Sequence, residues 1–245
     1  MNLTALLKDS FDLVKKNLLI ALPLLAVSVL MLLISLIFTG SMDPFDHTYM
    51  MGKMSPEAAA AGKSALGLFG VLVLMFLGSV LVLLAGGMTT AMVDQSIKEE
   101  RASLKTGWNR TLGRIVPLLI ASVLVGLLTG VGFILLVIPG IILAFLVMFA
   151  LPAVMIDEAG GLQSIGLSAK TVIGNLKTTV ILFLILIALG VIFGIVTTII
   201  GLIPIAGPII DAVISALYGA FMTAFIVLAY EGLKANPENP PEVEV

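Results

Sequence analysis

One run of 42 residues without a charged side chain, from Ile115 to Ile156, constrains the fold of this chain more than any other feature. At about 1.5 Å per residue such a run is roughly 60 Å of helix, which is twice the thickness of a hydrocarbon core. The chain must therefore cross a bilayer and return, and Ile138-Pro139-Gly140 interrupts the run where it can turn. This feature predicts an integral membrane protein.

Composition excludes several classes of function. Only 11% of the residues are charged and 60% are apolar, whereas about 25% would be charged in a soluble domain. The absence of cysteine and the single histidine leave little material for disulfides, metal sites or acid–base chemistry. A net charge of −2 gives no basic field, so we expect no nucleic-acid partner. Because no Walker loop, HExxH or GxSxG motif is present, we expect no enzyme and no cofactor.

Further uncharged stretches give the remaining membrane spans. Thirty uncharged residues lie between Lys63 and Asp94, 33 between Lys177 and Asp211, and 19 between Asp211 and Glu231. The first apolar run is longer than the core of a signal peptide, so we expect it to be retained as a span. We predict one all-α membrane domain over 1–234 and a disordered, Pro- and Glu-rich cytoplasmic tail over 235–245. Its six spans are expected near 18–40, 66–91, 115–137, 141–156, 178–201 and 209–230, with hairpin turns at Pro139-Gly140 and at 203–208.

The distribution of Lys and Arg predicts the orientation. Eleven of the 13 basic residues fall on one side of the predicted spans, and only Lys53 and Lys63 fall on the other. Because cytoplasmic loops carry the excess of Lys and Arg, both termini should lie in the cytoplasm of a cell-membrane protein, with the 41–63 loop outside.

Each predicted hairpin follows a segment with helical periodicity and an amphipathic pattern. Such helices lie in the membrane interface, with large apolar side chains towards acyl chains and Lys or Arg towards anionic head groups. The pattern predicts a fold of three repeats, each an interfacial helix plus a transmembrane hairpin. The apolar faces are Leu3, Leu6, Leu7, Phe11, Val14 and Leu18 in the first segment, Leu104, Trp108, Leu112 and Ile115 in the second, and Leu162, Ile165, Ala169, Val172, Ile173 and Leu176 in the third.

The second, fourth and sixth predicted spans end alike, each with an acid after two apolar or aromatic residues. The three acids are Asp94, Asp157 and Glu231. An acid at a helix C-terminus opposes the macrodipole, so we expect a compensating cation nearby. The basic residues that could supply it are Lys15 or Lys16, Arg110 or Arg114, and Lys170 or Lys177. In the alternative interpretation the acids are simply solvated and mark where water begins.

The central stretch of the chain carries a distinctive set of residues: Ile138-Pro139-Gly140-Ile141, Leu151-Pro152-Ala153-Val154, Asp157, Gly161, Ser168 and Gly174-Asn175. In these residues it resembles a superfamily of bacterial and archaeal membrane domains, which includes the membrane domain of glycerophosphoryl diester phosphodiesterases and small uncharacterised multi-span proteins. This resemblance implies a multi-span fold and little about activity, and no hydrolase activity is carried over because no catalytic domain is present.

Asp211, Ser215 and Tyr218 fall on one helical face of the sixth span and form a candidate polar path. The alternative is that Asp211 only lies near the positive dipole of a helix N-terminus, because Pro208 suits a first helical turn.

Two GxxxG motifs at similar places in two spans predict close helix packing, either within one chain or, as the second interpretation, in a homodimer. The GxxxG glycines are Gly126, Gly130, Gly190 and Gly194.

Two further features are less specific. Trp108 is expected to be an interfacial anchor. Methionines around His47 in the 41–63 loop would suit Cu(I), but their spacing is not diagnostic and we expect no metal site.

These features favour a non-enzymatic membrane protein that binds or moves a lipid-like or amphipathic small molecule. Its expected partners are membrane lipids, through their anionic head groups at the cytoplasmic face. The alternative is a structural or interaction protein that shapes or senses the bilayer, or docks a partner. A polar cavity that reaches Asp211 would favour the first function, and a solid bundle the second.

Overall fold

The computed structural model describes residues 2–39, 65–99, 101–204 and 206–235, and all regular structure in them is helical. Five helices are long and apolar enough to cross a membrane, and a sixth span results if a bent pair near the N-terminus counts as one. The elements are α1 (Leu3–Lys16), the 3₁₀ turn η1 (Leu18–Ala21), α2 (Leu22–Thr39), α5 (Ala65–Glu99), α6 (Leu104–Gly113), α7 (Ile115–Leu135), α8 (Val137–Leu146), α9 (Ala150–Met155), α10 (Gly161–Gly174), α11 (Leu176–Gly201) and α12 (Ala206–Ala235).

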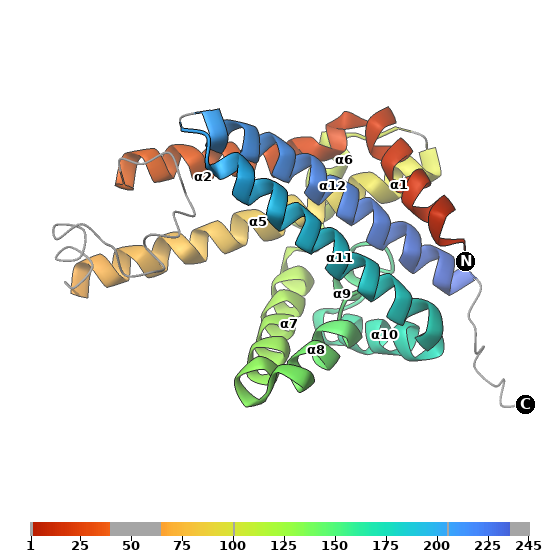
Figure 1. Cartoon of the computed structure of the whole chain (residues 1–245). Coiled ribbons are helices and arrows are strands. Elements are labelled where there is room, and N and C mark those ends of the chain that lie inside the picture. The colour runs from red at the N-terminus through yellow and green to blue at the C-terminus, as the bar shows by residue number, and fades with distance from the viewer. Residues whose placement is uncertain (1, 40–64, 100, 205, 236–245) are drawn as a thin grey trace, which may run out of the picture.

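The last described helix, α12, lies at the centre of the fold. It packs against α1, α2, α5 and α11. The long helices α2 and α11 run alongside α12, while the α7–α8 hairpin points away from them (Figure 1). The buried face of α12 carries Ala212, Ala216, Ala220 and Ala224, one every four residues. In lipid, packing and not hydrophobicity drives helix association, so this stripe of small side chains lets neighbouring helices approach closely.

The α7–α8 hairpin turns earlier than the sequence predicts. A single extended residue, Leu136, separates the two helices, and Pro139 and Gly140 lie inside the first turn of α8. The predicted turn at Pro139-Gly140 is therefore wrong: Pro139 occupies a first helical turn, where its missing N–H costs nothing. Gly140 serves close packing, because a Cβ atom on Gly132 of α7 would lie 2.8 Å from the Gly140 Cα atom.

The fourth span is broken into α8 and α9. Between them, the Ser168 hydroxyl of α10 donates a hydrogen bond to the Leu146 carbonyl (2.7 Å) and accepts one from the Phe149 N–H (3.0 Å). Ser168 is fully buried. Within a bilayer an irregular backbone persists only where its polar groups find partners in the protein, and this one hydroxyl satisfies both sides of the break.

Three short helices, α1, α6 and α10, each precede a pair of long segments, and we call them the collar helices. The axis of α1 makes an angle of 91° with the helical segment that follows it. α6 and α7 are joined through Arg114 alone, and α10 and α11 through Asn175 alone. The collar helix α1 therefore runs in a direction distinct from that of the span it precedes, as expected for an interfacial helix.

Candidate functional site

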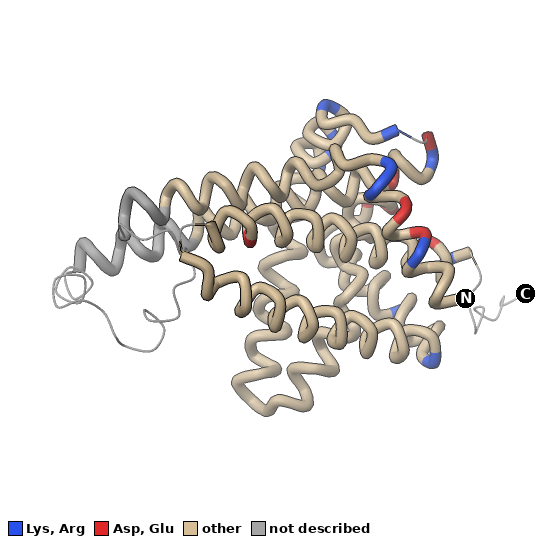
Figure 2. Tube along the Cα trace, turned by 45° about the horizontal axis from the view of Figure 1, so that its top comes forward, with Lys and Arg blue, Asp and Glu red and all other residues tan. Residues whose placement is uncertain are grey.

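Charged residues of the described part of the chain gather at one end of the molecule, where the N-terminus lies, while the rest of the long helices carries almost none (Figure 2). Ion pairs and one pocket connect this set, which we call the charged end. Its members are Asp94, Lys98, Arg110, Arg114, Asp157, Glu158 and Lys234.

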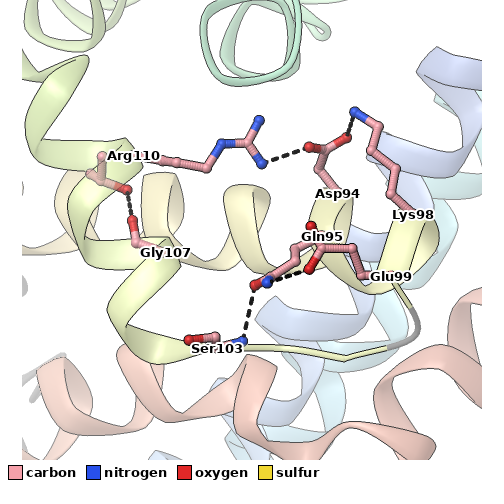
Figure 3. A network of polar contacts seen from close by, with 8 residues as sticks. Asp94, Gln95, Lys98, Glu99, Ser103, Gly107 and Arg110 are labelled. Carbon is pink, nitrogen blue, oxygen red and sulfur yellow. Dashed lines mark hydrogen bonds and ion pairs between the residues drawn. The ribbon is translucent and has the colours of Figure 1, made fainter.

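Asp94, near the end of α5, is the most deeply buried charged group of this set, with a side chain only 1% exposed. The Arg110 Nη1 atom of α6 donates to its Oδ2 atom at 2.7 Å, and the Lys98 Nζ atom lies 2.5 Å from its Oδ1 atom. Figure 3 shows the two cations approaching the carboxylate from different sides. Asp94 therefore pairs with Arg110, one of the collar cations predicted to compensate the three acids. Lys98 was missed, although its i+4 spacing from Asp94 is a recognised sign of an ion pair on a helix.

A second set of contacts fixes the turn between α5 and α6 and so brings Arg110 to Asp94. The Ser103 N–H donates to the Gln95 side-chain oxygen (3.1 Å), while the Gln95 amide donates to the Glu99 carboxylate (2.8 Å), as Figure 3 also shows. The Ser103 hydroxyl accepts from the Thr106 N–H (3.4 Å) as the N-cap of α6. Sequence reasoning singled out none of these four residues as part of the site.

Asp157 takes its partners from α12 and not from a collar helix. The Tyr230 hydroxyl donates to its Oδ2 atom, and the Lys234 ammonium pairs with its Oδ1 atom. The expectation of a collar cation for Asp157 is therefore wrong. α12 continues to Ala235, and this extra length places Tyr230 and Lys234, four residues apart, on the face that meets Asp157.

The third acid, Glu231, lies on the same helix and interacts electrostatically with Asp94, Lys98 and Lys234. The cations near Glu231 therefore include Lys98 of α5 and Lys234 of α12, neither of which belongs to a collar helix. Lys170 and Lys177 are exposed. A role for Lys16 in balancing one of the three acids stays a prediction.

A polar pocket of about 190 Å³ opens beside Arg110. It is lined by Arg110, Gly113, Arg114, Met155 and Glu158. The Arg114 Nη1 atom donates to the Glu158 carbonyl oxygen (2.5 Å), and the Nη2 atom pairs with the Glu158 carboxylate. Sequence reasoning missed Glu158, because nothing in its local pattern shows that a residue 44 positions earlier reaches it.

The collar helices bury small or polar residues and expose large apolar ones. α6 buries Gly107 and Thr111 and leaves Trp108 47% exposed. α10 buries Ser164, Ser168 and Val172 and leaves Leu162 73% exposed. The outward apolar side chains predicted for α6 are confirmed as exposed, as Trp108 should be if it is an interfacial anchor.

α1 follows this scheme only in part. Leu6, Ser10 and Val14 are buried, mainly where α1 crosses α12, while Phe11 is 58% exposed. The expectation that Leu6 and Val14 face lipid is wrong, as it is for Val172 of α10. An amphipathic pattern identifies an apolar face but does not say whether protein or lipid covers it.

The proposed polar face of α12 makes contacts inside the bundle. The Ser215 hydroxyl lies 3.4 Å from the Asp211 Oδ2 atom, and the Tyr218 ring stacks on Phe193 with centroids 3.8 Å apart. Asp211 lies in the second turn of α12, after Pro208, so its predicted position near a helix N-terminus is confirmed. Neither the polar pocket nor an apolar one of about 270 Å³ on α7 is lined by these residues. A polar path at Asp211 stays a prediction.

The GxxxG glycines do not pack within the chain as expected. A Cβ atom on Gly126, Gly130 or Gly194 would meet nothing within 4 Å, and one on Gly190 would lie 3.9 Å from the Tyr218 hydroxyl. The prediction of intramolecular packing is therefore wrong for Gly126, Gly130 and Gly194, and Gly190 makes only a slight contact. The alanine stripe of α12 performs this role instead, and its spacing of four was visible in the sequence.

The structure bears on metal binding only in the part of the chain that it describes. Among the described residues, no group of three or more His, Asp or Glu side chains is placed to hold a metal ion. The methionines around His47 lie outside the described residues, as does the tail over 236–245.

The helices define an all-helical, multi-pass membrane protein. The chain belongs to the family "Domain of unknown function (DUF7847)", which matches residues 48–233. No curated protein and no solved structure matches this chain. The resemblance to the glycerophosphoryl diester phosphodiesterase membrane domain stays a prediction.

Proposed function

We propose that this protein is a non-enzymatic, multi-pass protein of the cell membrane that binds amphipathic lipids through its collar helices. The observation that carries this proposal is the exposure of large apolar side chains, such as Trp108 and Leu162, on short helices at the charged end. Helices of this kind lie at head-group depth, where apolar side chains meet acyl chains and nearby cations meet phosphates.

The charged end faces the cytoplasm in this proposal. Eleven of the 13 basic residues belong to segments expected on that side, and the inner leaflet carries the anionic lipids that such segments bind.

A threefold internal repeat underlies the proposed collar. Each collar helix ends in a cap residue with φ between −118° and −133°: Asn17, Arg114 or Asn175. The residues three and seven positions before each cap are buried in all three helices. Equal spacing of buried positions from equivalent caps supports three copies of one unit. These positions are Val14 and Ser10, Thr111 and Gly107, and Val172 and Ser168.

Native mass spectrometry with lipid extraction, on protein in native membrane discs, tests the proposal. A lipid enriched over the bulk membrane in the wild type should be lost when Trp108 and Leu162 are both changed to Ser. The matched control is Leu202→Ser, because Leu202 is 77% exposed but lies between α11 and α12, away from the collar. Loss only in Asp211→Asn would move the binding site to α12, and bulk lipid alone in the wild type would contradict lipid binding.

A second candidate function, shaping or sensing the bilayer, is favoured by the 91° angle after α1. A helix held at that angle to a span lies in the plane of one leaflet and acts as a wedge. Electron microscopy of proteoliposomes at increasing protein density would show tubes or smaller vesicles if this function is correct. Unchanged vesicle shape and size would reject it.

A further inference from the structure

The polar pocket brings two guanidinium groups together at the start of a span. Arg110 comes from the last turn of α6, and Arg114 is the single residue between α6 and α7. The large side chains next to Arg114, Leu112 and Val116, are 40% and 62% exposed. The pocket therefore lies where exposed apolar surface meets fixed positive charge, which is the environment of a lipid head group.

The two arginines differ in how firmly their partners hold them. The carboxylate of Arg110 belongs to Asp94, whose side chain is 1% exposed, whereas that of Arg114 belongs to Glu158, whose side chain is 71% exposed. An exposed ion pair contributes little stability, because water competes with both groups. The Glu158 carboxylate can therefore leave Arg114 at little cost, while Asp94 stays with Arg110.

The backbone of Glu158 keeps Arg114 in position when the carboxylate leaves. Arg114 Nη1 donates to the carbonyl oxygen of Glu158, and only Nη2 pairs with the side chain. Glu158 has φ of 55°, the one left-handed non-glycine residue in the described part of the chain. A residue rarely found in this conformation is held here by its surroundings, and the bond from Arg114 is one contact that holds it.

We infer that this pocket receives a phosphate group, which replaces the Glu158 carboxylate on Arg114. The inference rests on the proposed function and names its ligand chemistry: a phosphate ester, either of a lipid head group or of a small soluble molecule. A planar guanidinium matches phosphate oxygens in geometry and charge. The volume of about 190 Å³ admits a phosphate group and leaves the acyl chains of a lipid outside, against α7.

Thermal unfolding of the full chain in a zwitterionic detergent tests the inference, with three added probes: short-chain phosphatidate, short-chain phosphatidylcholine and inorganic phosphate. Phosphatidate should raise the melting temperature, and the concentration needed should rise about tenfold in Arg114→Gln, because one charge-assisted pair is lost. Glu158→Gln should lower that concentration about two- to fivefold, since it removes the competing carboxylate. Arg114→Lys should fall between the wild type and Arg114→Gln, because it keeps the charge without the planar fork.

Lys170→Gln is the matched control, since it removes one exposed cation of a collar helix outside the pocket. It should leave the phosphatidate midpoint within about twofold of the wild type. A response to phosphatidate alone identifies a lipid head group, and an equal response to inorganic phosphate identifies a soluble phosphate compound. No response to phosphatidate or to inorganic phosphate, equal losses in Arg114→Gln and Lys170→Gln, or no gain in Glu158→Gln would overturn the inference.

This experiment separates the pocket from the broader proposal. If the lipid enriched in native discs stays enriched in Arg114→Gln, the pocket inference is wrong and collar binding stands. If no lipid is enriched but phosphate still raises the melting temperature through Arg114, the proposed function is wrong and the pocket stands.

Discussion

At the scale of single residues, Asp94 shows how this fold carries a charge out of water. Its carboxylate is buried but touches one guanidinium and one ammonium group, and both cations keep part of their surface in solvent. A buried carboxylate that loses its partner is costly, while an exposed cation that loses its partner returns to water. The two cations should therefore contribute unequally to stability.

Arg110→Ala should lower the free energy of unfolding by about 2 kcal/mol, because the 2.7 Å bond to the buried carboxylate is lost and Lys98 is the ion-pair partner that remains. Lys98→Ala should cost less than about 1 kcal/mol, since that side chain is 53% exposed. Denaturant unfolding in detergent measures both. Restoration of stability by Asp94→Asn in the Arg110→Ala background would confirm the cause, and equal losses in the two single variants would contradict it.

At the scale of elements, the break between α8 and α9 depends on a side chain from a third helix. Apolar run length predicted that a fourth span exists, and turn residues predicted a helix end near 140, but neither signal contains Ser168. Long spans follow from local composition, so α7 and α11 begin and end within two residues of their predicted limits. Contacts between distant segments do not follow from local composition, and the partners of Asp157 and Arg114 were missed for the same reason.

Ser168→Ala should lower the free energy of unfolding by about 2 kcal/mol, because it leaves the buried Phe149 N–H and the part-buried Leu146 carbonyl without that partner. Ser164→Ala is the matched control, since its hydroxyl is also buried on α10 but bonds only to Gly161 of its own helix. It should cost less than about 1 kcal/mol. Thermal unfolding compares the two, and hydrogen exchange at the Phe149 amide should quicken only in Ser168→Ala.

Two sets of glycines on α7 should respond in opposite ways to substitution. Gly132→Ala places a Cβ atom 2.8 Å from the Gly140 Cα atom, so the α7–α8 hairpin must open and stability should fall by about 1–3 kcal/mol. Gly126→Ala and Gly130→Ala meet open space and should be neutral or stabilising by up to about 1 kcal/mol. Native mass spectrometry adds a second reading: loss of a dimer in Gly126→Ala or Gly130→Ala would support the homodimer interpretation of this motif.

At the scale of the whole molecule, the separation of charge from the apolar helices gives the chain a direction in the membrane. The sequence predicted this separation well, because charge-free runs and basic segments are read residue by residue. It predicted less well which apolar surfaces are shared between helices. Ala212, Ala216, Ala220 and Ala224 are buried in the bundle, whereas Gly126 and Gly130 are exposed, and both sets have the same spacing of four.

The chain has no cysteine, so single-cysteine variants test the proposed direction directly. Lys105→Cys lies at the charged end and Leu202→Cys between α11 and α12, and both positions are exposed. A membrane-impermeant maleimide should label Leu202→Cys in intact cells and Lys105→Cys only after permeabilisation. The reverse pattern would place the charged end outside the cell.

The central position of α12 has a consequence for biosynthesis. Because the ribosome makes the chain from the N-terminus, α1, α2, α5 and α11 all leave it before the helix they pack against has been synthesised. Until then, the apolar surfaces destined for α12 must be covered by lipid or by the insertion machinery. The bundle therefore closes late, in one step that joins the first helix to the last, and a ribosome that stalls before Ala206 leaves a set of inserted helices without their common support.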